Sequence, residues 1–207
     1  IIAISTGATD DAVEDGEYLL GTQLDELRRL GSQHRIWANE THALIRRAGF
    51  GTGDRILDLG CGPGLCTVDL AHLVGPSGHV IAVDRSERFL GALRDSVASE
   101  GLTNVETRHA EADATDVETA SQSGVFMRWV LCYGPDPKQV VREIARVLEP
   151  GGTLAILDYF NYEAFDLFPS SPPFRVMVDA VVDSFRATGG DLDVGNHLPA
   201  LLRPLGF

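Results

Sequence analysis

The feature that most constrains the fold is an apolar strand that runs into an acid and then into three alternating glycines. Residues 56–64 read Ile-Leu-Asp-Leu-Gly-Cys-Gly-Pro-Gly, and a second apolar run, residues 80–83, ends at Asp84. Glycine lets a backbone pass close to a ligand without a side-chain clash. An acid at the end of the second strand is placed to accept hydrogen bonds from a ribose diol. The pattern therefore predicts a strand–turn–helix unit at a nucleoside site.

The spacing of the glycines separates two kinds of nucleotide site. Dinucleotide-binding proteins use Gly-x-Gly-x-x-Gly and hold a pyrophosphate at a helix N-terminus. Here Gly60, Gly62 and Gly64 alternate, and no Lys or Arg lies between Arg55 and Arg85. The acid two residues before the first glycine would repel phosphate but could hold an ammonium group. The loop therefore indicates a nucleoside with an amino-acid tail, as in S-adenosylmethionine. A glycine turn that serves only strand–helix packing is the alternative.

The stretch around Asp58 resembles motif I of the class I S-adenosylmethionine-dependent methyltransferases. The similarity covers roughly residues 18–207, and three further stretches are similar to a bacterial small-molecule subgroup or to the segment before strand 5: residues 128–137, 146–152 and 189–195. The chain departs from the family at residues 121–124, Ser-Gln-Ser-Gly, where an Asp commonly precedes strand 4.

Alternating apolar strands and amphipathic helices predict a doubly wound, Rossmann-like α/β sheet that is mostly parallel, with strand order 3-2-1-4-5. The terminal strand hairpin of the family is not seen before Phe207. We expect either further chain or a second copy, as in a homodimer, to cover the open sheet edge, because an uncovered edge risks aggregation. The expected strands span about 55–59, 79–83, 104–109, 125–131 and 153–157, and the expected helices span 65–74, 87–100 and 137–148.

The chain is expected to divide into an N-terminal helical extension, residues 1–50, and an S-adenosylmethionine-binding domain, residues 51–207. Helical spacing of apolar residues within 18–48 predicts two helices separated at Gly31. The segment resembles the lid of the small-molecule subgroup, which would exclude water from the site. A simple pair of packing helices is the alternative.

The resemblance implies a role for each residue of a cofactor site. Backbone at Gly60, Cys61, Gly62 and Gly64 would approach the cofactor, although Cys61 also fits the role of a small apolar filler. Asp58 would orient the methionine end, Asp84 would hold the ribose, and Arg85 would flank the adenine. Asp113, with Ala114 beside it, would accept from the adenine amino group, or else serve as a solvated loop acid or helix cap. Arg128 would reach the pocket or pair with Asp58 or Asp158, since a buried charge needs a partner.

Methyl transfer mainly needs the acceptor aligned with the methyl group, and a general base only where the acceptor must lose a proton. Tyr133, Asp158, Tyr159 and His34 are the candidates for that base, although a structural role suits each of them better. No metal site is visible, and no Asn-Pro-Pro-Tyr or Asp-Pro-Pro-Tyr run points to methylation of amino groups on bases or glutamine.

The amino-acid composition restricts the classes of partner that the chain is expected to bind. With 17 basic and 30 acidic residues the net charge is −13, which argues against nucleic acid as a substrate. The three cysteines lack metal-site spacing, and no leader or membrane span is evident, so we expect a cytoplasmic protein without a membrane partner. The expected function is methyl transfer to a small molecule. The alternative is a non-methylating S-adenosylmethionine-binding protein, either a regulatory module or a rearrangement or cyclisation catalyst.

Overall fold

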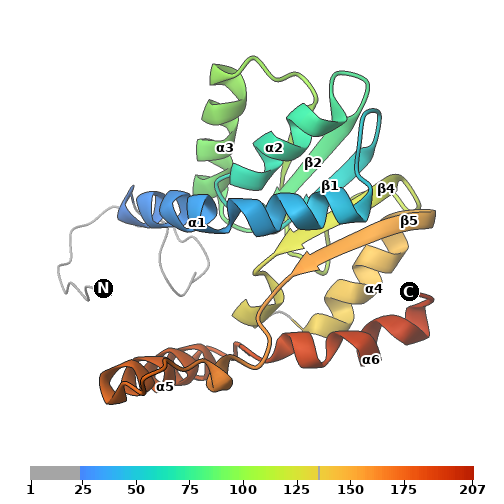
Figure 1. The fold of residues 1–207 in the computed structure, drawn as a ribbon. Coiled ribbons are helices and arrows are strands. Elements are labelled where there is room, and N and C mark those ends of the chain that lie inside the picture. Colours follow the sequence, from blue (N-terminus) through green and yellow to red (C-terminus); the bar gives the residue numbers. More distant parts are fainter. Residues whose placement is uncertain (1–23, 135) are drawn as a thin grey trace.

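A five-stranded parallel sheet forms the centre of the molecule. The computed structural model describes residues 24–134 and 136–207, and the sheet order is β3-β2-β1-β4-β5 (Figure 1). This order confirms the prediction. The strands are β1 (Arg55–Leu59), β2 (His79–Asp84), β3 (Val105–His109), β4 (Gln122–Arg128) and β5 (Leu148–Leu157).

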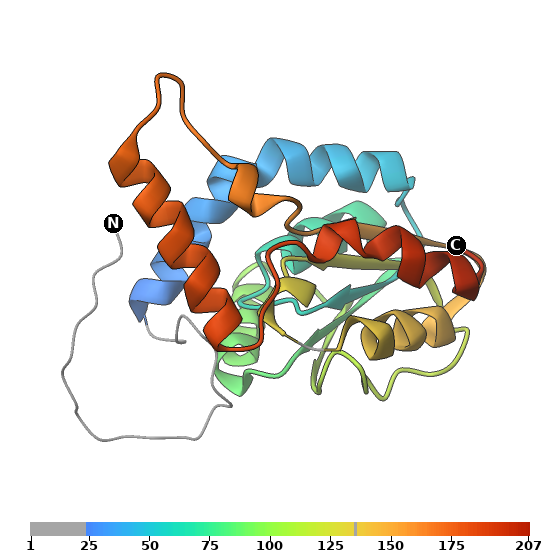
Figure 2. The same ribbon diagram turned by 90° about the horizontal axis from the view of Figure 1, so that it is seen from below.

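Helices cover both faces of the sheet because successive strand residues point to opposite sides. Ile56 and Phe126 pack with α1 (Leu24–Ala48) and α2 (Leu65–Val74), while Ala82 packs with α3 (Glu87–Ser99). Leu57 and Met127 pack on the other face with α4 (Pro137–Val147) and α5 (Pro172–Ala187). The short helix α6 (Leu198–Leu202) lies beside α4 (Figures 1 and 2).

Two helix starts follow the expected capping chemistry. The Ser86 hydroxyl accepts from the backbone N–H of Phe89 at the start of α3. The Asp136 carboxylate accepts from the N–H of Lys138, and Pro137 takes the first position of α4. These side chains satisfy donors that the helix itself leaves without an acceptor.

The predicted break at Gly31 is wrong, because α1 is one continuous helix through that residue. An interior glycine costs only about 1 kcal/mol relative to alanine. That cost is offset locally by the ion pair between Glu26 and Arg29 and by packing of residues such as Ile45 against the sheet. The part of the lid prediction that concerns residues 18–23 lies outside the described residues.

Strand bounds are the other correction. β4 begins at Gln122 rather than 125 and ends at Arg128 rather than 131, because Trp129 adopts a positive φ of 53° and a 3-10 turn, Leu131–Tyr133, follows. β5 begins at Leu148, five residues early, and passes through Pro150-Gly151-Gly152, which we expected to lie outside the strand. An irregularity in pairing between Gln122 and Gly124 accommodates these residues.

Candidate active site

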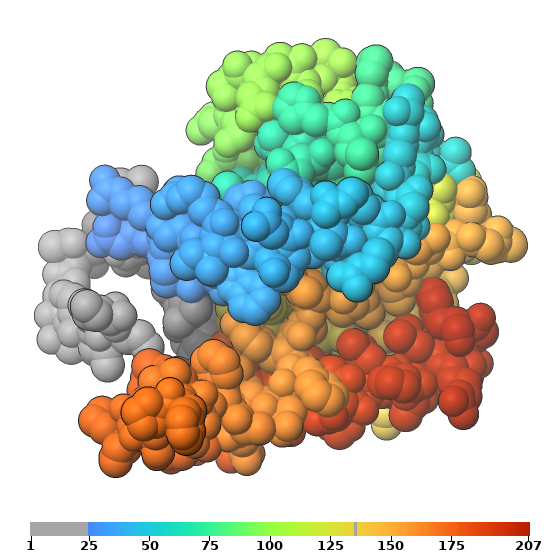
Figure 3. Space-filling model, viewed as in Figure 1, coloured from blue at the N-terminus to red at the C-terminus, as the bar shows by residue number. Residues whose placement is uncertain are grey.

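A cavity of about 530 Å³ lies at the carboxyl ends of β1, β2 and β4, where doubly wound folds bind their ligands. Its lining comes from the β1–α2 loop, the end of β2, the loop after β3 and the end of β4. Leu30 and Gln33 of α1 complete it. In the space-filling view, α1 crosses the molecule above the segment that contains α5 (Figure 3). The volume falls in the range of small-molecule and cofactor pockets.

The glycine loop follows β1 and turns back toward β2. The N–H groups of Gly60 and Cys61 both donate to the Val83 carbonyl, at 2.8 and 3.0 Å. Gly62 has a φ of +55°, and a Cβ placed there would meet nothing within 4 Å, so backbone is exposed to the cavity at this point. Gly64, by contrast, does not line the cavity, because a Cβ there would lie 2.1 Å from Leu93 Cδ1 in α3.

Cys61 also lines the cavity, but its thiol is buried and burial raises its pKa well above the usual value. A thiol in that state stays protonated at neutral pH and is a poor nucleophile. This environment suits the small apolar filler among the two roles considered for Cys61.

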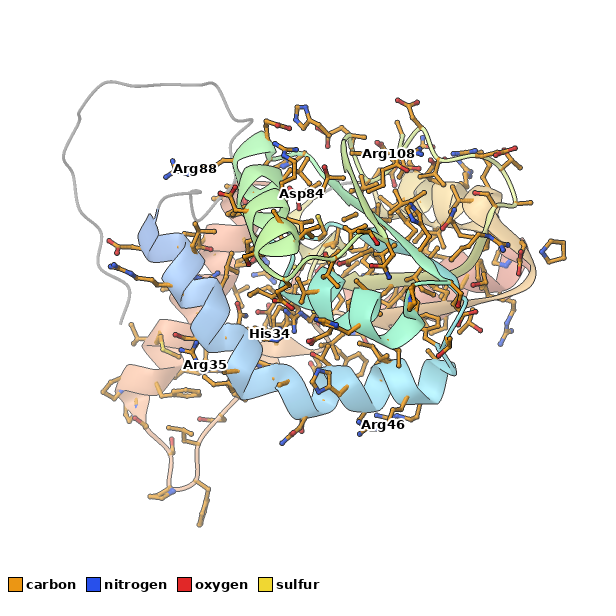
Figure 4. All side chains as sticks on the ribbon, turned by 90° about the horizontal axis from the view of Figure 1, so that it is seen from above. His34, Arg35, Arg46, Asp84, Arg88 and Arg108 are labelled. Atoms are coloured by element: carbon orange, nitrogen blue, oxygen red, sulfur yellow. The ribbon has the colours of Figure 1, made fainter. Side chains whose placement is uncertain are left out.

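Asp84 ends β2 with its carboxylate at the cavity. One oxygen accepts from the Gly62 N–H at 2.7 Å and the other from the Ser86 N–H at 2.9 Å. Burial raises the pKa of Asp84, while these backbone donors oppose the rise. A carboxylate offers about four acceptor positions, more than the backbone donors of Gly62, Ser86 and Arg85 use, so Asp84 can still accept from a ribose hydroxyl. Figure 4 shows Asp84 beside α3.

Asp58 is more deeply enclosed, with 2% of its surface exposed. The Thr67 hydroxyl donates to its carboxylate at 2.6 Å. Burial raises the pKa of Asp58 to about 6, and the nearby Arg128 charge and the Thr67 bond work against that rise. A buried carboxylate that faces a cavity is stabilised by a cationic ligand group, and the ammonium group of the cofactor is such a group.

Arg128 lines the same cavity from the end of β4. Its Nη1 donates to Thr41 Oγ1 at 3.0 Å and its Nη2 to His34 Nδ1 at 3.4 Å, both on α1. The guanidinium also lies 4.8 Å from the centre of the Trp129 ring. The expected pocket contact is thus present, whereas hydroxyl, imidazole and indole contacts replace the direct carboxylate partner we had considered.

The loop after β3 lines another part of the cavity. Asp113 belongs to the lining, as does Arg85 from the end of β2. Ala114 forms an isolated bridge with Glu111 and lies outside the lining. The roles assigned to these residues stay predictions.

The four candidate general bases differ in whether their side chains line the cavity. Tyr133 lines the cavity, with its ring 5.3 Å from that of Phe185. Asp158 lies outside the lining and accepts from the N–H groups of Val130, Leu131 and Tyr159, so it holds the turn after β4. The Tyr159 ring stacks 6.2 Å from Trp129, and burial raises its pKa. His34 reaches the cavity only through Arg128.

The sequence interpretation gave no site role to many of the lining residues, and four of them show why. Leu30 and Gln33 come from α1, and Thr188 follows α5. Trp129 was noted only as part of a resemblance. A positive φ at a bulky aromatic residue carries no sequence signal, so its place in the wall could not be read from the chain.

Two further observations concern metals and membranes. Within residues 24–134 and 136–207, no group of three or more His, Cys, Asp or Glu side chains is arranged to hold a metal ion. None of the helices in that part of the chain is both long enough and apolar enough to cross a bilayer.

Comparison with known proteins places the chain among methyltransferases. A family described as "Methyltransferase domain" matches residues 56–152. The demethylmenaquinone methyltransferase of Lactococcus lactis subsp. lactis (strain IL1403) is 34% identical, over 98% of this chain and 84% of the relative. The arsenite methyltransferase of Halobacterium salinarum is 32% identical, over 96% of this chain but only 48% of the relative.

A solved structure shares the fold. The crystal structure of an S-adenosylmethionine-dependent methyltransferase from Aquifex aeolicus superimposes with a TM-score of 0.62 at 24% identity, covering 78% of this chain and 86% of that one. The cavity fits the cofactor of that family by its size, by open backbone at Gly62 and by the paired acids Asp58 and Asp84. The non-methylating alternative is not favoured. The chain belongs to the class I S-adenosylmethionine-dependent methyltransferases, enzymes that in this case move a methyl group to a small-molecule acceptor.

Proposed function

We propose that the cofactor lies along the glycine loop with its ribose on Asp84 and its amino-acid tail between Asp58 and Arg128. The buried acid Asp58, the partly buried acid Asp84 and an arginine around one cavity support this placement. Asp58 would meet the ammonium group and Arg128 the carboxylate, so each charge of the tail finds its opposite. Asp113 would accept from the adenine amino group. The bound cofactor supplies a methyl group on a sulfonium, already activated for transfer.

We further propose that the acceptor is a flat, apolar ring compound of the demethylmenaquinone type. The observation that carries this proposal is an aromatic wall at the end of β4, in which Trp129 and Tyr133 line the cavity. Trp129 contacts the Arg128 guanidinium and stacks with the Tyr159 ring, and these contacts restrain its orientation. Its φ of +53° is unusual for a bulky residue, and such backbone outliers cluster at functional sites. The demethylmenaquinone methyltransferase relative supports the same acceptor class.

The residues of the wall would orient the acceptor and exclude water. Val130 and Trp129 supply apolar contact, and Tyr133 brings a phenolic hydroxyl that can hold a ring hydroxyl of the acceptor. Proximity and alignment of this kind account for much of the rate gain in displacement reactions. On this proposal the protein itself supplies binding and orientation of the acceptor.

Arsenite is the second acceptor to consider because of the Halobacterium salinarum relative. Soft thiolate ligands would be needed to hold it. All three cysteines are buried, and burial raises the pKa of each thiol. Protonated, enclosed thiols are poor ligands, so the cavity favours the ring acceptor.

The test is methyl transfer to a reduced naphthoquinone that lacks the ring methyl group, followed by mass spectrometry. We expect a product heavier by one methyl group and none with arsenite. Measured at saturating S-adenosylmethionine, Trp129→Leu should lower kcat/KM for the acceptor about 10-fold or more, a loss that exceeds any loss of cofactor affinity caused through the contact between Trp129 and Arg128. Trp37→Leu is the matched control, because Trp37 touches the Trp129 ring edge-on but lies outside the lining. Cofactor binding without transfer to the naphthoquinol would refute the acceptor class alone.

We also propose a cytoplasmic location and a homodimer joined at the β5 edge. Three free, unbridged cysteines suit a reducing compartment. Cell fractionation tests the first proposal, and a cytoplasmic protein should appear with the cleared lysate after ultracentrifugation.

A further inference from the structure

Helix α1 is joined to the end of β4, at the cavity, through the side chain of Arg128. Thr41, which has no exposed surface, accepts from Nη1 at 3.0 Å. His34 Nδ1 accepts from Nη2 at 3.4 Å. Both acceptors lie on α1, 87 and 94 residues before Arg128 in the chain. The contact therefore depends on how α1 is placed over the sheet.

The surroundings of His34 define the form in which it meets Arg128. Its Nε2 lies 3.7 Å from an Asp69 carboxylate oxygen of α2, and that oxygen is also 2.8 Å from His42 Nε2. A neutral imidazole with its proton on Nε2 satisfies both sides, since Nε2–H faces a carboxylate and Nδ1 faces a donor. Burial and the Arg128 charge lower the pKa of His34, and Asp69 opposes them. Figure 4 shows His34 on the inner side of α1.

Arginine recognises a carboxylate best when its planar fork is held in one orientation. A guanidinium has five N–H donors, and Thr41 and His34 occupy two of them. The Trp129 ring, 4.8 Å away, restrains the plane of the group. The remaining donors are thus presented in a defined direction rather than sampled by a flexible side chain.

We propose that His34 and Thr41 are positioning residues that orient Arg128 for the carboxylate of the cofactor tail. The inference rests on the proposed placement of that tail between Asp58 and Arg128. It gives α1 a part in cofactor affinity that does not depend on the acceptor. His34, considered above as a general base, acts on the ligand through Arg128 instead.

The experiment compares two ligands by isothermal titration calorimetry. S-adenosylhomocysteine has the amino-acid tail, whereas 5′-methylthioadenosine has the same nucleoside and no tail. His34→Leu and Thr41→Val remove the acceptors. We expect each variant to weaken the binding of S-adenosylhomocysteine about 5- to 10-fold, while the Kd of methylthioadenosine stays within about 2-fold of the wild-type value. Arg128→Met should weaken the binding of S-adenosylhomocysteine by at least the same factor. Unchanged methylthioadenosine binding also shows that each variant is folded.

Two conservative variants and one neighbour sharpen the result. His34→Asn places an oxygen acceptor near the position of Nδ1, and Thr41→Ser keeps the hydroxyl, so both should retain most of the wild-type affinity. His42→Leu is the matched control, since His42 contacts Asp69 from the same helix at 2.8 Å but is not bonded to Arg128. It should change neither ligand's affinity.

The outcomes separate the two proposals. If Arg128→Met leaves S-adenosylhomocysteine binding unchanged, the placement of the tail is wrong and the positioning role goes with it. If Arg128→Met weakens binding but His34→Leu and Thr41→Val do not, the placement stands and the positioning role is overturned. Equal losses for both ligands would likewise overturn it, because they would show a general disturbance of the cavity.

Discussion

At the scale of single residues, Asp58 couples cofactor binding to stability. Its pKa rises from 3.8 to about 6 on folding, because the folded protein favours the protonated acid. The contribution of Asp58 to the stability of the fold is therefore complete below pH 4 and is lost as the pH rises through 6. Asp58→Asn stays neutral at all pH values. At pH 7.5 we therefore expect the ligand-free variant to be more stable than wild type by roughly 1–3 kcal/mol, since one pKa unit is worth about 1.4 kcal/mol.

The same variant should bind S-adenosylmethionine about 10-fold or more weakly, because the buried partner of the ammonium group is gone. Chemical denaturation of both proteins between pH 4 and pH 7.5 measures the first effect, and calorimetry measures the second. The stability difference should shrink toward pH 4. A variant that is less stable than wild type at pH 7.5 would contradict the assigned pKa direction.

Two glycines of the loop are expected to respond differently to alanine. At Gly64, with φ at +83°, an added Cβ would lie 2.1 Å from Leu93, so Gly64→Ala should cost about 2 kcal/mol or more from strain and overlap. At Gly62 a Cβ meets nothing, so Gly62→Ala should cost about 1 kcal/mol from its φ of +55° alone. The added methyl group would, however, enter the cavity and weaken cofactor binding. Thermal unfolding and cofactor titration of the two variants check this, and equal losses of stability would count against it.

Single residues also show how far sequence reasoning reaches. Asp58 and Asp84 could be assigned because they end apolar runs and parallel strands end at one edge of the sheet. Trp129 could not, because its positive φ and its contacts with Arg128 and Tyr159 arise from tertiary packing. His34 was singled out as a titratable group, but its neighbour Arg128 lies 94 residues away in the chain.

At the scale of elements, periodicity predicted strands and helices well but not where α1 and β5 run through residues that usually interrupt them. Gly31 sits inside α1 and Pro150-Gly151-Gly152 inside β5. Breaking propensities are worth about 1 kcal/mol for a glycine, which tertiary packing outweighs. Only the assembled sheet shows that Leu148 pairs with Gln122 and extends β5 past the proline.

One network of side chains joins α4 to the loop that carries Asp113. Glu143 on α4 accepts from the N–H and hydroxyl of Thr115, and Arg146 donates to Glu143 and to the Val117 carbonyl. The Arg146 guanidinium lowers the pKa of Glu143 to about 2. An acid with a lowered pKa stabilises the fold above its unfolded value of 4.5 and loses that contribution as the pH falls through 2.

Glu143→Gln should therefore destabilise the protein by about 1–3 kcal/mol at pH 7, with the difference from wild type shrinking below pH 4.5. Loss of order in the adjoining loop should also weaken cofactor binding through Asp113. Glu118→Gln is the control, because that side chain is exposed in the same loop. Denaturation curves at pH 7 and pH 3 test the prediction, and identical losses for the two variants would refute it.

At the scale of the whole molecule, strand order and the position of the cavity were predictable because alternating strands and helices leave few topologies. The set of residues that lines the cavity was less predictable. Its lining draws on α1, on the end of β4 and on Thr188, which are brought together only when the helices pack on the sheet. Chemistry that depends on one contiguous motif was therefore visible in the sequence, and chemistry that depends on assembly was not.

The two edges of the sheet differ in a way that bears on assembly. β3 carries Glu106 and Arg108, which pair at 2.6 Å, and charged side chains of this kind protect an edge strand from pairing with another chain. β5, at the opposite edge, runs Thr-Leu-Ala-Ile-Leu over residues 153–157 with no charge. We therefore expect two copies of the chain to associate through β5 and not through β3.

A lysine on each edge strand distinguishes the two surfaces. Thr153→Lys places a charge on β5 and Thr107→Lys places the same charge on β3, where it also removes the acceptor of a 3.4 Å hydrogen bond from Arg94. Light scattering coupled to size exclusion, over a range of protein concentrations, should show a dimer for wild type and for Thr107→Lys but a monomer for Thr153→Lys. Like charges across a two-fold interface repel each other, which is the physical reason for the expected dissociation. A wild-type protein that stays monomeric at the highest concentration, or a dimer that Thr107→Lys dissociates, would show that β5 is not the surface through which the copies meet.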